Sequence, residues 1–387
     1  MTADAVAATT HALACVSCGT RQDGAGYHTA CSCCGGLLDT VYDLSRAAIG
    51  EPSLDPVSRF AGLLPARPAA FPPGHGVVST PLIQLETGDA VPVTTYAKWE
   101  GGQPTGSAKY PMAVVALTYM HERGVRGFTF SSTGNTTAAF ASALRMWPGM
   151  TGHVFAPAGF PVPTDAPPNL IVYEVPGDYA KAHHVAAATR FDGAVAEGGF
   201  FSVGRREGLK LAYLDALLAA PRPPTVVVQA VSSGMGIVAA AKAAGELAAM
   251  GLIERKPRLV AVQQASCAPM AASFQAGAAA LRPGDVIQAP QGRAIAILLG
   301  DPSASYPYVR AAVASSGGTV TEVPDPDITA ALHCLRRHNL DPCCSSATAL
   351  GALAGLRRSG WITDADVVLV NLTGSARSAA GRQEATR

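Results

Sequence analysis

The chain has 387 residues, enough for two or three domains of ordinary size. Hydrophobic residues make up 48% of it and charged residues only 15%, a composition that excludes an intrinsically disordered protein. The formal net charge of +1 argues against broad nucleic-acid binding, which depends on neutralising phosphates.

Neither a membrane span nor a secretory signal is predicted. The most apolar long segment, 226–254, is interrupted by Lys242 and Glu246. The N-terminal segment carries Asp4 and no Lys or Arg before Cys15, so it lacks the basic start of a secretory signal. We therefore expect a cytoplasmic protein whose cysteines are thiols or metal ligands rather than disulfides.

Two Cys-x-x-Cys pairs lie near the N-terminus, Cys15 with Cys18 and Cys31 with Cys34, and twelve residues separate them. Each pair is followed by a glycine that allows a tight turn, and four thiolates so spaced suit a tetrahedral structural zinc site. Cys33 is the spare thiol. A zinc-ribbon-like segment is predicted, either with bound metal or as an empty ribbon. A catalytic role is not expected, because a four-cysteine site leaves no position open for substrate.

Beyond a proline-rich connector at 46–75, short β-branched runs alternate with alanine-rich stretches of helical character. This alternation is typical of parallel βαβ units and predicts an α/β fold. Ligands bind beyond the carboxyl ends of the strands in open α/β sheets, so the loops after the strands are the candidate sites. The expected strands are 125–132, 152–157, 225–231, 259–264 and 367–372, and the expected helices are 136–146 and 237–250.

The loop Ser232-Ser233-Gly234-Met235-Gly236 joins an apolar strand to an alanine-rich helix. Its glycines allow backbone N–H groups to approach a ligand, and the helix N-terminus adds partial positive charge, so the loop predicts a phosphate cradle. It is not a nucleotide-binding P-loop, because it lacks Gly-Lys-Ser/Thr. By itself, this loop is equally well interpreted as a structural turn.

The loop Ser132-Thr133-Gly134-Asn135-Thr136 presents hydroxyls and an amide at another helix N-terminus. That group suits a carboxylate, and its density exceeds what a simple N-cap needs.

A third loop follows the strand VVLVNL, where Thr373 offers a hydroxyl. A strand-ending turn is an equally good interpretation of that loop.

Lys109 stands in the segment PTGSAKYP, directly before a helical stretch that ends at Gly124. Because Tyr110 precedes a proline, the helix is expected to start at about Pro111, which places Lys109 at its positive end. The dipole there favours a neutral amine, the form that Schiff-base chemistry requires. The alternative is a solvated surface lysine.

Four motifs, taken together and in order, resemble the threonine synthase family of pyridoxal-phosphate enzymes of fold type II. They are PTGSAK, SSTGNT, SSGMG and LTGS, with RREGLK and the N-terminal cysteines as weaker matches over about residues 15–378. The resemblance implies an α/β fold with two three-layer αβα domains after the zinc-ribbon-like segment. The expected boundaries are 1–45 for the ribbon, 46–112 with 215–387 for a large cofactor-binding domain, and 113–214 for a small mobile domain.

The resemblance also implies a role for each matched residue. Lys109 carries pyridoxal 5'-phosphate and acts as catalytic base. Asn135 bonds the ring oxygen, Thr373 faces the pyridine nitrogen, and Arg205 helps to hold a substrate phosphate unless it is only a helix-surface charge. The phosphate of the cofactor binds Ser232, Ser233, Gly234, Met235 and Gly236, and the substrate carboxylate binds Ser132, Thr133 and Thr136.

The sequence departs from the family pattern around the substrate. The family usually has Asp-Arg after the lysine, where this chain has Tyr110-Pro111. Upstream of Arg205 the family often has Asn-Ser, where this chain has 198–201, Gly-Gly-Phe-Phe. Two further departures are Ala108, where the family has Phe, and Ser232-Ser233 with Met235 in the phosphate loop, where the family has a Gly/Asn pattern. All these changes are compatible with a cofactor site and concern the identity of the substrate.

The function implied is elimination and replacement at the β or γ carbon of an activated, O-phosphorylated amino acid, in a specialised biosynthetic pathway. A hydroxyl at Thr373 would not keep the ring nitrogen protonated, which favours elimination over transamination. The alternatives are O-phosphoserine replacement of the cysteate or cysteine synthase kind, serine or threonine dehydration, and a non-catalytic zinc-ribbon regulator. The partner is a small-molecule amino acid, and a homodimer is implied. A dinucleotide-dependent oxidoreductase is disfavoured because Gly-x-Gly-x-x-Gly is absent.

Overall fold

The computed structural model describes residues 11–88, 91–132, 134–160, 163–378, 382 and 384. Contacts divide the chain into two compact units. The first unit comprises Met1–Ser79 and Lys109–Leu211, and the second comprises Thr80–Ala108 and Ala212–Arg387. The domain boundaries expected after residues 45, 112 and 214 stay predictions.

The first unit begins with a small antiparallel sheet. Its strands β1 (His11–Cys15), β2 (Arg21–Gln22) and β3 (Leu38–Tyr42) lie in the order β2-β1-β3. The proline-rich segment that follows contains the short helix α1 (Pro56–Arg59) and buries Phe60 and Leu63 completely. This segment is therefore a packed part of the first unit as well as a connector.

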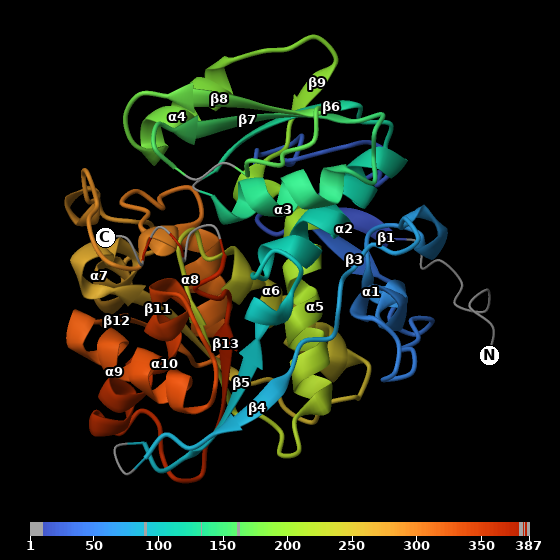
Figure 1. The fold of residues 1–387 in the computed structure, drawn as a ribbon. Coiled ribbons are helices and arrows are strands. Elements are labelled where there is room, and N and C mark those ends of the chain that lie inside the picture. The colour runs from blue at the N-terminus through green and yellow to red at the C-terminus, as the bar shows by residue number, and fades with distance from the viewer. Residues whose placement is uncertain are drawn as a thin grey trace. The chain divides into compact units, whose positions relative to one another are not determined.

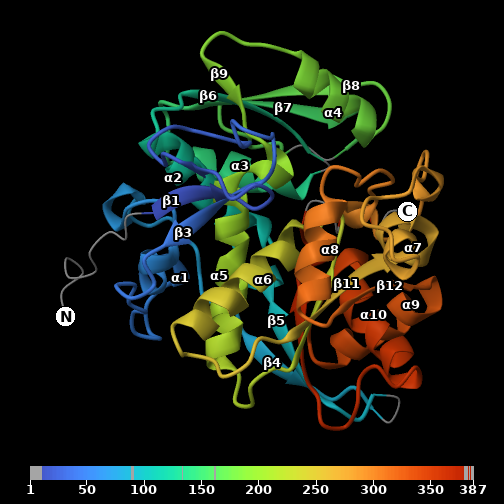
Figure 2. The ribbon, with the colours of Figure 1, turned by 180° about the vertical axis from the view of Figure 1, so that it is seen from behind.

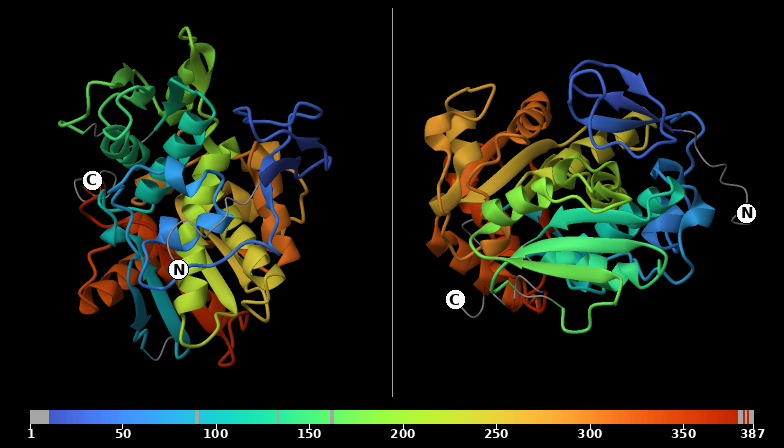
Figure 3. Two further views of the ribbon diagram at one scale, coloured as in Figure 1. Left: turned by 90° about the vertical axis from the view of Figure 1, so that its right-hand side faces the viewer. Right: turned by 90° about the horizontal axis from the view of Figure 1, so that it is seen from above.

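The first unit also contains a four-stranded parallel sheet, ordered β8-β7-β6-β9 (Figure 1 and Figure 3). The chain moves from β6 to β7 through α3 and returns from β8 to β9 through α4. Right-handed crossovers in opposite directions place α3 and α4 on opposite faces of this sheet, which makes three layers. The elements are β6 (Gly127–Ser131), β7 (Thr151–Pro157), β8 (Leu170–Val175), β9 (Ala194–Ala196), α2 (Lys109–Glu122), α3 (Asn135–Leu144) and α4 (Tyr179–Ala188).

Helix α5 (Val203–Ala219) packs closely on α2 through two glycines. A Cβ atom at Gly204 would lie 2.6 Å from Ala116 Cα, and one at Gly208 would lie 2.6 Å from Met112 Cα. Contacts this short exclude any side chain at either position. They fix how α5 lies against the helix that begins at Lys109.

The second unit is built on a six-stranded sheet ordered β12-β11-β10-β13-β5-β4, in which only the edge strand β4 runs antiparallel to its neighbour (Figure 2). Helices α6 and α8 lie in the connections from β10 to β11 and from β11 to β12, and they cover one face of the sheet. The connection from β12 to β13 runs in the opposite direction across the sheet, so its helices α9 and α10 cover the other face. The elements are β4 (Leu82–Leu85), β5 (Thr94–Trp99), β10 (Val226–Ala230), β11 (Arg258–Gln264), β12 (Thr319–Val323), β13 (Val367–Leu372), α6 (Met235–Ala249), α7 (Pro269–Gln275), α8 (Tyr306–Ser315), α9 (Asp325–Arg337) and α10 (Cys344–Arg358).

The central strands β10 and β13 of the second sheet are rich in valine and leucine because both of their faces are covered. All the residues of β10 and β13 are buried, and Val226, Val228, Val368 and Val370 pack with α9 and α10 in one core. Single 3-10 turns connect several elements: η2 (Ala61–Leu63), η3 (Pro68–Ala70), η4 (Glu100–Gly102), η5 (Gly199–Phe201), η6 (Ala265–Cys267), η7 (Pro283–Asp285) and η8 (Ile295–Ile297).

All the expected strands and helices are present, with ends that differ by up to two residues. The start of α2 is a correction: the helix begins at Lys109, not at about Pro111. The first N–H groups of a helix have no intrahelical partner, so a proline in its third position loses no hydrogen bond. Within the described ranges, no helix is both long and apolar enough to cross a bilayer.

Candidate active site

Lys109 is the first residue of α2 and follows a turn that pairs with the end of β13. The N–H of Ala108 donates to the carbonyl of Thr373 at 2.9 Å, and Ser107 bridges to Gly374. The lysine side chain is half-buried. Burial first, and then the positive charge of Arg205, lower the pKa of Lys109 from 10.5 to about 8. About a tenth of this amine is therefore neutral at pH 7, against well under a thousandth for a lysine with the ordinary pKa of 10.5, so it is not an ordinary surface lysine.

Tyr110, which stands where the family has an aspartate, is buried in the first unit. Its hydroxyl donates to the carbonyl of His75 at 2.7 Å. The substitution therefore attaches the start of α2 to the proline-rich segment.

The loop after β6 places its polar groups at the N-terminus of α3. Ser132 is buried, and its hydroxyl accepts from the N–H groups of Gly134 at 3.2 Å and Thr137 at 3.0 Å. Ser132 thus caps the helix. Asn135 and Thr136 are half-buried in the first turn, where the helix end favours an anion. Thr133, also expected here, lies outside the described residues.

Arg205 lies in the first turns of α5 and is 6% exposed, so it is not a helix-surface charge. Its Nε–H donates to Glu197 Oε1 at 2.7 Å, and its Nη2 lies 2.5 Å from Oε2. The guanidinium also lies over the rings of Phe130 and Phe140, with its carbon 5.7 and 5.3 Å from their centroids. This carboxylate balances the positive charge that was expected to hold a substrate phosphate.

The rest of the RREGLK motif holds the N-terminal segment on α5. Glu207 is fully buried and accepts from Thr40 Oγ1 at 2.6 Å and from the hydroxyl of Tyr42 at 2.9 Å. Lys210 pairs with Glu207 and donates to the carbonyl of Leu63 at 2.7 Å. Of the four charged residues in this motif, Arg205 pairs with Glu197, and the other three bond the N-terminal segment or the chain near it.

In the second unit, the loop Ser232–Gly236 follows β10 and begins α6. Gly234 has a left-handed φ of +82° at the N-cap, and no side chain caps this helix. A Cβ atom at Gly234 would lie 2.2 Å from Val309 Cγ2, so the turn requires glycine. Backbone N–H groups at a helix N-terminus that no side chain caps fit the phosphate of pyridoxal phosphate.

Thr373 follows β13 in the same unit. Its hydroxyl lies 3.5 Å from that of Ser346, which also bonds the N–H and the carbonyl of Gly374, each at 2.7 Å. Two buried polar atoms of the same unit have no hydrogen-bond partner within the described part of the structure: Asn371 Oδ1, two residues before Thr373, and Oγ of Ser107, which bridges to Gly374. Unsatisfied buried polar atoms beside a threonine hydroxyl fit a polar ring such as that of the cofactor.

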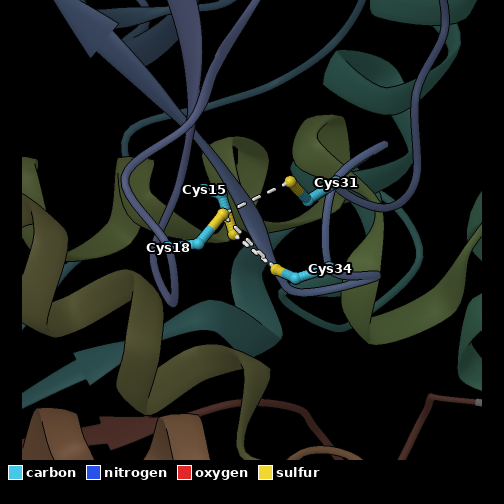
Figure 4. Close-up of side chains that lie close together, drawn as sticks. All are labelled: Cys15, Cys18, Cys31 and Cys34. Atoms are coloured by element: carbon cyan, nitrogen blue, oxygen red, sulfur yellow. Dashed lines mark hydrogen bonds between the residues drawn. The ribbon is translucent and has the colours of Figure 1, made fainter.

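The four predicted cysteines converge at the end of the N-terminal sheet (Figure 4). The sulfurs of Cys15, Cys18, Cys31 and Cys34 all lie within 4.8 Å of one another. Three of their separations are 3.5, 3.7 and 3.5 Å, close to the roughly 3.8 Å edge of a tetrahedron with zinc–sulfur bonds of about 2.3 Å. Cys33 is exposed and stays outside the cluster. The four donors fit a structural zinc ion.

The expected residues thus fall into two groups. The first unit contains Lys109, Ser132, Asn135, Thr136 and Arg205, and the second contains Thr373 and the loop Ser232–Gly236.

Two residues of consequence were missed from the sequence, Glu197 and Ser346. The signal for Glu197 was an acidic residue directly after the strand β9, and the signal for Ser346 was a serine in the first turn of α10.

The chain is similar to a known protein family and to several known proteins. The family model for pyridoxal-phosphate dependent enzymes matches residues 75–374. Cysteate synthase from Methanoculleus marisnigri is 29% identical, with 88% of this chain and 83% of that protein covered. Threonine synthase from Halalkalibacterium halodurans is 30% identical, with 78% and 82% covered.

Solved structures show the same fold. The structure of threonine synthase from Escherichia coli matches with a TM-score of 0.71 at 16% identity, covering 96% of this chain and 90% of that one. The processed form of threonine deaminase isoform 2 from Solanum lycopersicum matches with a TM-score of 0.63 at 16% identity, covering 82% and 91%.

Proposed function

Because this chain belongs to the pyridoxal-phosphate dependent enzyme family, we propose that it catalyses elimination and replacement on an activated, O-phosphorylated amino acid. The observation that carries the proposal is Lys109, a half-buried amine at the start of α2 whose pKa is lowered to about 8. Relatives named threonine synthase and cysteate synthase, each matched over most of their length, support this reaction class. The choice between a γ and a β carbon is left to experiment.

The cofactor, when bound, supplies an electron sink for the negative charge that develops at the substrate α-carbon. In this proposal, Lys109 would hold the cofactor, and its freed neutral amine would take the α-proton. The backbone N–H groups of the loop Ser232–Gly236 would hold the cofactor phosphate, and Asn135 and the Thr373 hydroxyl would serve the polar atoms of the ring. A hydroxyl there does not stabilise a ring proton as a carboxylate would, which favours elimination.

We assign the substrate carboxylate to the N-terminus of α3. There the hydroxyls of Thr136 and Ser132 can each donate a hydrogen bond to it. Arg205 is assigned to the substrate's anionic group as one half of an ion pair with Glu197. A balanced arginine attracts an anion less strongly than a free one, so other donors must share the phosphate.

The visible spectrum tests this proposal first. We expect a yellow absorbance band that borohydride traps on Lys109, and we expect its loss in Lys109→Ala. The exposed Lys181→Ala variant is the matched control and should keep the band. A colourless protein that stays colourless with added pyridoxal phosphate would contradict the proposal and favour a non-catalytic regulator.

Substrate analogues then separate the enzyme alternatives. O-Phosphohomoserine and O-phosphoserine should each be tested for a change in the band and for release of phosphate. Release of phosphate from O-phosphoserine with sulfite or sulfide as acceptor would favour the cysteate or cysteine synthase type. Ammonia release from serine or threonine, with no response to either phosphate ester, would favour a dehydratase.

We also propose that the four N-terminal cysteines hold structural zinc, which the convergence of their sulfurs supports. Metal analysis of the purified chain should give one zinc per chain. Cys18→Ser should lose the metal, whereas the matched control Cys33→Ser should retain it. Equal metal content in both variants would contradict the site.

The proposed protein is a homodimer in the cytoplasm. Its partner is a small-molecule amino acid. The resemblance alone supports the dimer, and sedimentation equilibrium tests it.

A further inference from the structure

The Glu197–Arg205 pair is held from outside by the N-terminal segment. The hydroxyl of Tyr27 donates to the backbone carbonyl of Glu197 at 2.5 Å. The next residue, Gly198, has a left-handed φ of +98°, and a Cβ atom there would lie 2.6 Å from Thr29 Cγ2. The chain between the two cysteine pairs therefore packs tightly on the turn that carries Glu197.

The backbone of that turn also donates a hydrogen bond to the Glu197 carboxylate. Besides Arg205, Glu197 Oε2 accepts the N–H of Gly199 at 3.1 Å, and the Glu197 side chain is fully buried. Each of these contacts depends on the conformation of the backbone that Tyr27 holds. Burial, and then the negative charge of Glu197, raise the pKa of Tyr27 well above 10, so its hydroxyl stays a donor.

The cysteines themselves are part of the same packing. One apolar cluster comprises Leu13, Cys15, Cys31, Leu38, Tyr119 and Val203, with Tyr27 packed against it. Tyr119 lies on α2, the helix that begins at Lys109, and its ring lies 5.9 Å from that of Tyr27. Val203 begins α5, two residues before Arg205. Two of the four proposed metal ligands thus pack on both helices that carry the charged site residues.

We propose that Tyr27 is a positioning residue of the active site, through which the four-cysteine ribbon holds Glu197 against Arg205 and so sets the charge that Lys109 experiences. The inference rests on the proposed role of Lys109 and adds a contribution from residues that never touch the substrate. The ribbon is then more than a stabilising appendage, because its ordering by metal adjusts the reactive amine.

The sign of the effect follows from electrostatics. The positive charge of Arg205 already lowers the pKa of Lys109. If Glu197 moves away or loses its charge, Arg205 is no longer balanced, and a neighbouring positive charge disfavours the ammonium form further. Loosening Tyr27 should therefore make Lys109 easier to deprotonate.

The test measures the amine directly on the full chain, after removal of cofactor with hydroxylamine. The rate constant for acylation of Lys109 is followed against pH by peptide mass spectrometry. For Glu197→Gln we expect the midpoint to fall from about 8 to about 7, which is roughly tenfold faster labelling well below the midpoint. For Tyr27→Phe we expect a shift in the same direction, with labelling about twofold to threefold faster at pH 7.

Tyr42→Phe is the matched control. It removes another tyrosine hydroxyl from the same segment, one that bonds Glu207 at 2.9 Å rather than Glu197. It should cost stability comparable to Tyr27→Phe and leave the midpoint of Lys109 unchanged. If Glu197→Gln does not fold, the pair of tyrosine variants still decides the question.

Removing the metal from the wild-type chain with a chelator should shift the midpoint as Tyr27→Phe does, and added zinc should restore it. Equal midpoints for the two tyrosine variants, or an unchanged midpoint after proven metal loss, would overturn the proposal. This outcome is distinct from failure of the proposed function, because acylation of Lys109 needs neither cofactor nor substrate.

Discussion

The loops at the carboxyl ends of the two parallel sheets differ in charge. In the first unit, the loop after β9 contains Glu197, which pairs with Arg205, and the positive charge of that arginine lowers the pKa of Lys109. In the second unit, the loops after β10 and β13 contain hydroxyls, glycines and backbone N–H groups, with no charged side chain at 231–236 or 372–376. The same architecture thus provides two kinds of site.

The difference follows from what each loop is proposed to do. A group that moves a proton needs its pKa adjusted, and nearby charge and burial do this. A phosphate needs N–H donors fixed in place, and a glycine turn at a helix N-terminus provides them without a counterion. In the proposed function, the loops of the first sheet therefore contain the reactive groups and those of the second contain the phosphate cradle.

The largest expected effect concerns the buried ion pair of the first unit. Arg205→Met leaves the fully buried Glu197 carboxylate without its partner, which should cost about 3–5 kcal/mol of unfolding free energy. Urea denaturation measures this cost. The double variant Glu197→Gln with Arg205→Met should recover a large part of it. A single-variant cost below about 1 kcal/mol would mean that the pair is solvated.

The next effect is the pH dependence of cofactor capture. Capture needs the neutral amine of Lys109, which increases as pH rises through about 8. The rate constant for capture should rise nearly a hundredfold between pH 6 and 9 and then level. Stopped-flow absorbance measures it. A rate that continues to rise beyond pH 10 would indicate an ordinary lysine.

The cradle of the second unit should be sensitive to one methyl group. Gly234→Ala places a Cβ 2.2 Å from Val309 Cγ2 at a left-handed φ, a strain of about 1–3 kcal/mol. We expect the Kd for pyridoxal phosphate to rise about 5- to 150-fold in equilibrium titrations.

Gly245→Ala in the same helix is the control for that variant, because nothing lies within 4 Å of its Cβ position. It should leave the Kd unchanged and stabilise the helix by about 1 kcal/mol. A similar loss of cofactor affinity in both variants would refute a local cradle.

The smallest effect lies at the amino-terminal edge of the second sheet. Burial opposes ionisation of Asp366, but hydrogen bonds from Thr363, Thr225 and Arg258 outweigh it and hold the pKa at about 2. Because this pKa is below the ordinary value of 3.8, the stabilisation is present above about pH 4 and is lost as pH falls towards 2.

Thr225→Val removes one of those hydrogen bonds and should cost about 1 kcal/mol at neutral pH. Thermal unfolding at pH 7 and pH 2 measures the loss. The difference from wild type should shrink at pH 2, and an equal difference at both values would exclude Asp366 as its cause.

Most of the fold could be predicted from the chain alone. Alternating β-branched and alanine-rich segments identified the strands β6, β7, β10, β11 and β13 and the helices α2, α3 and α6, whereas β4, β5, β8, β9 and β12 were not predicted. The ordered motifs identified the pyridoxal-phosphate family, which the comparisons confirm. The convergence of four cysteines was predictable from their spacing. The start of α2 was predicted two residues too late, because proline was treated as a barrier at a position where helices tolerate it.

The sequence by itself determined which residues are candidates for chemistry, because strand ends, glycine turns and cysteine spacing are local patterns. Only the tertiary structure decided the charge state of that chemistry. Glu197 pairs with Arg205, which is eight residues later in the sequence, and Tyr27 bonds Glu197 although 170 residues separate them in the sequence. Burial and the pairing of charges arise from such contacts, and no local pattern of residues encodes them.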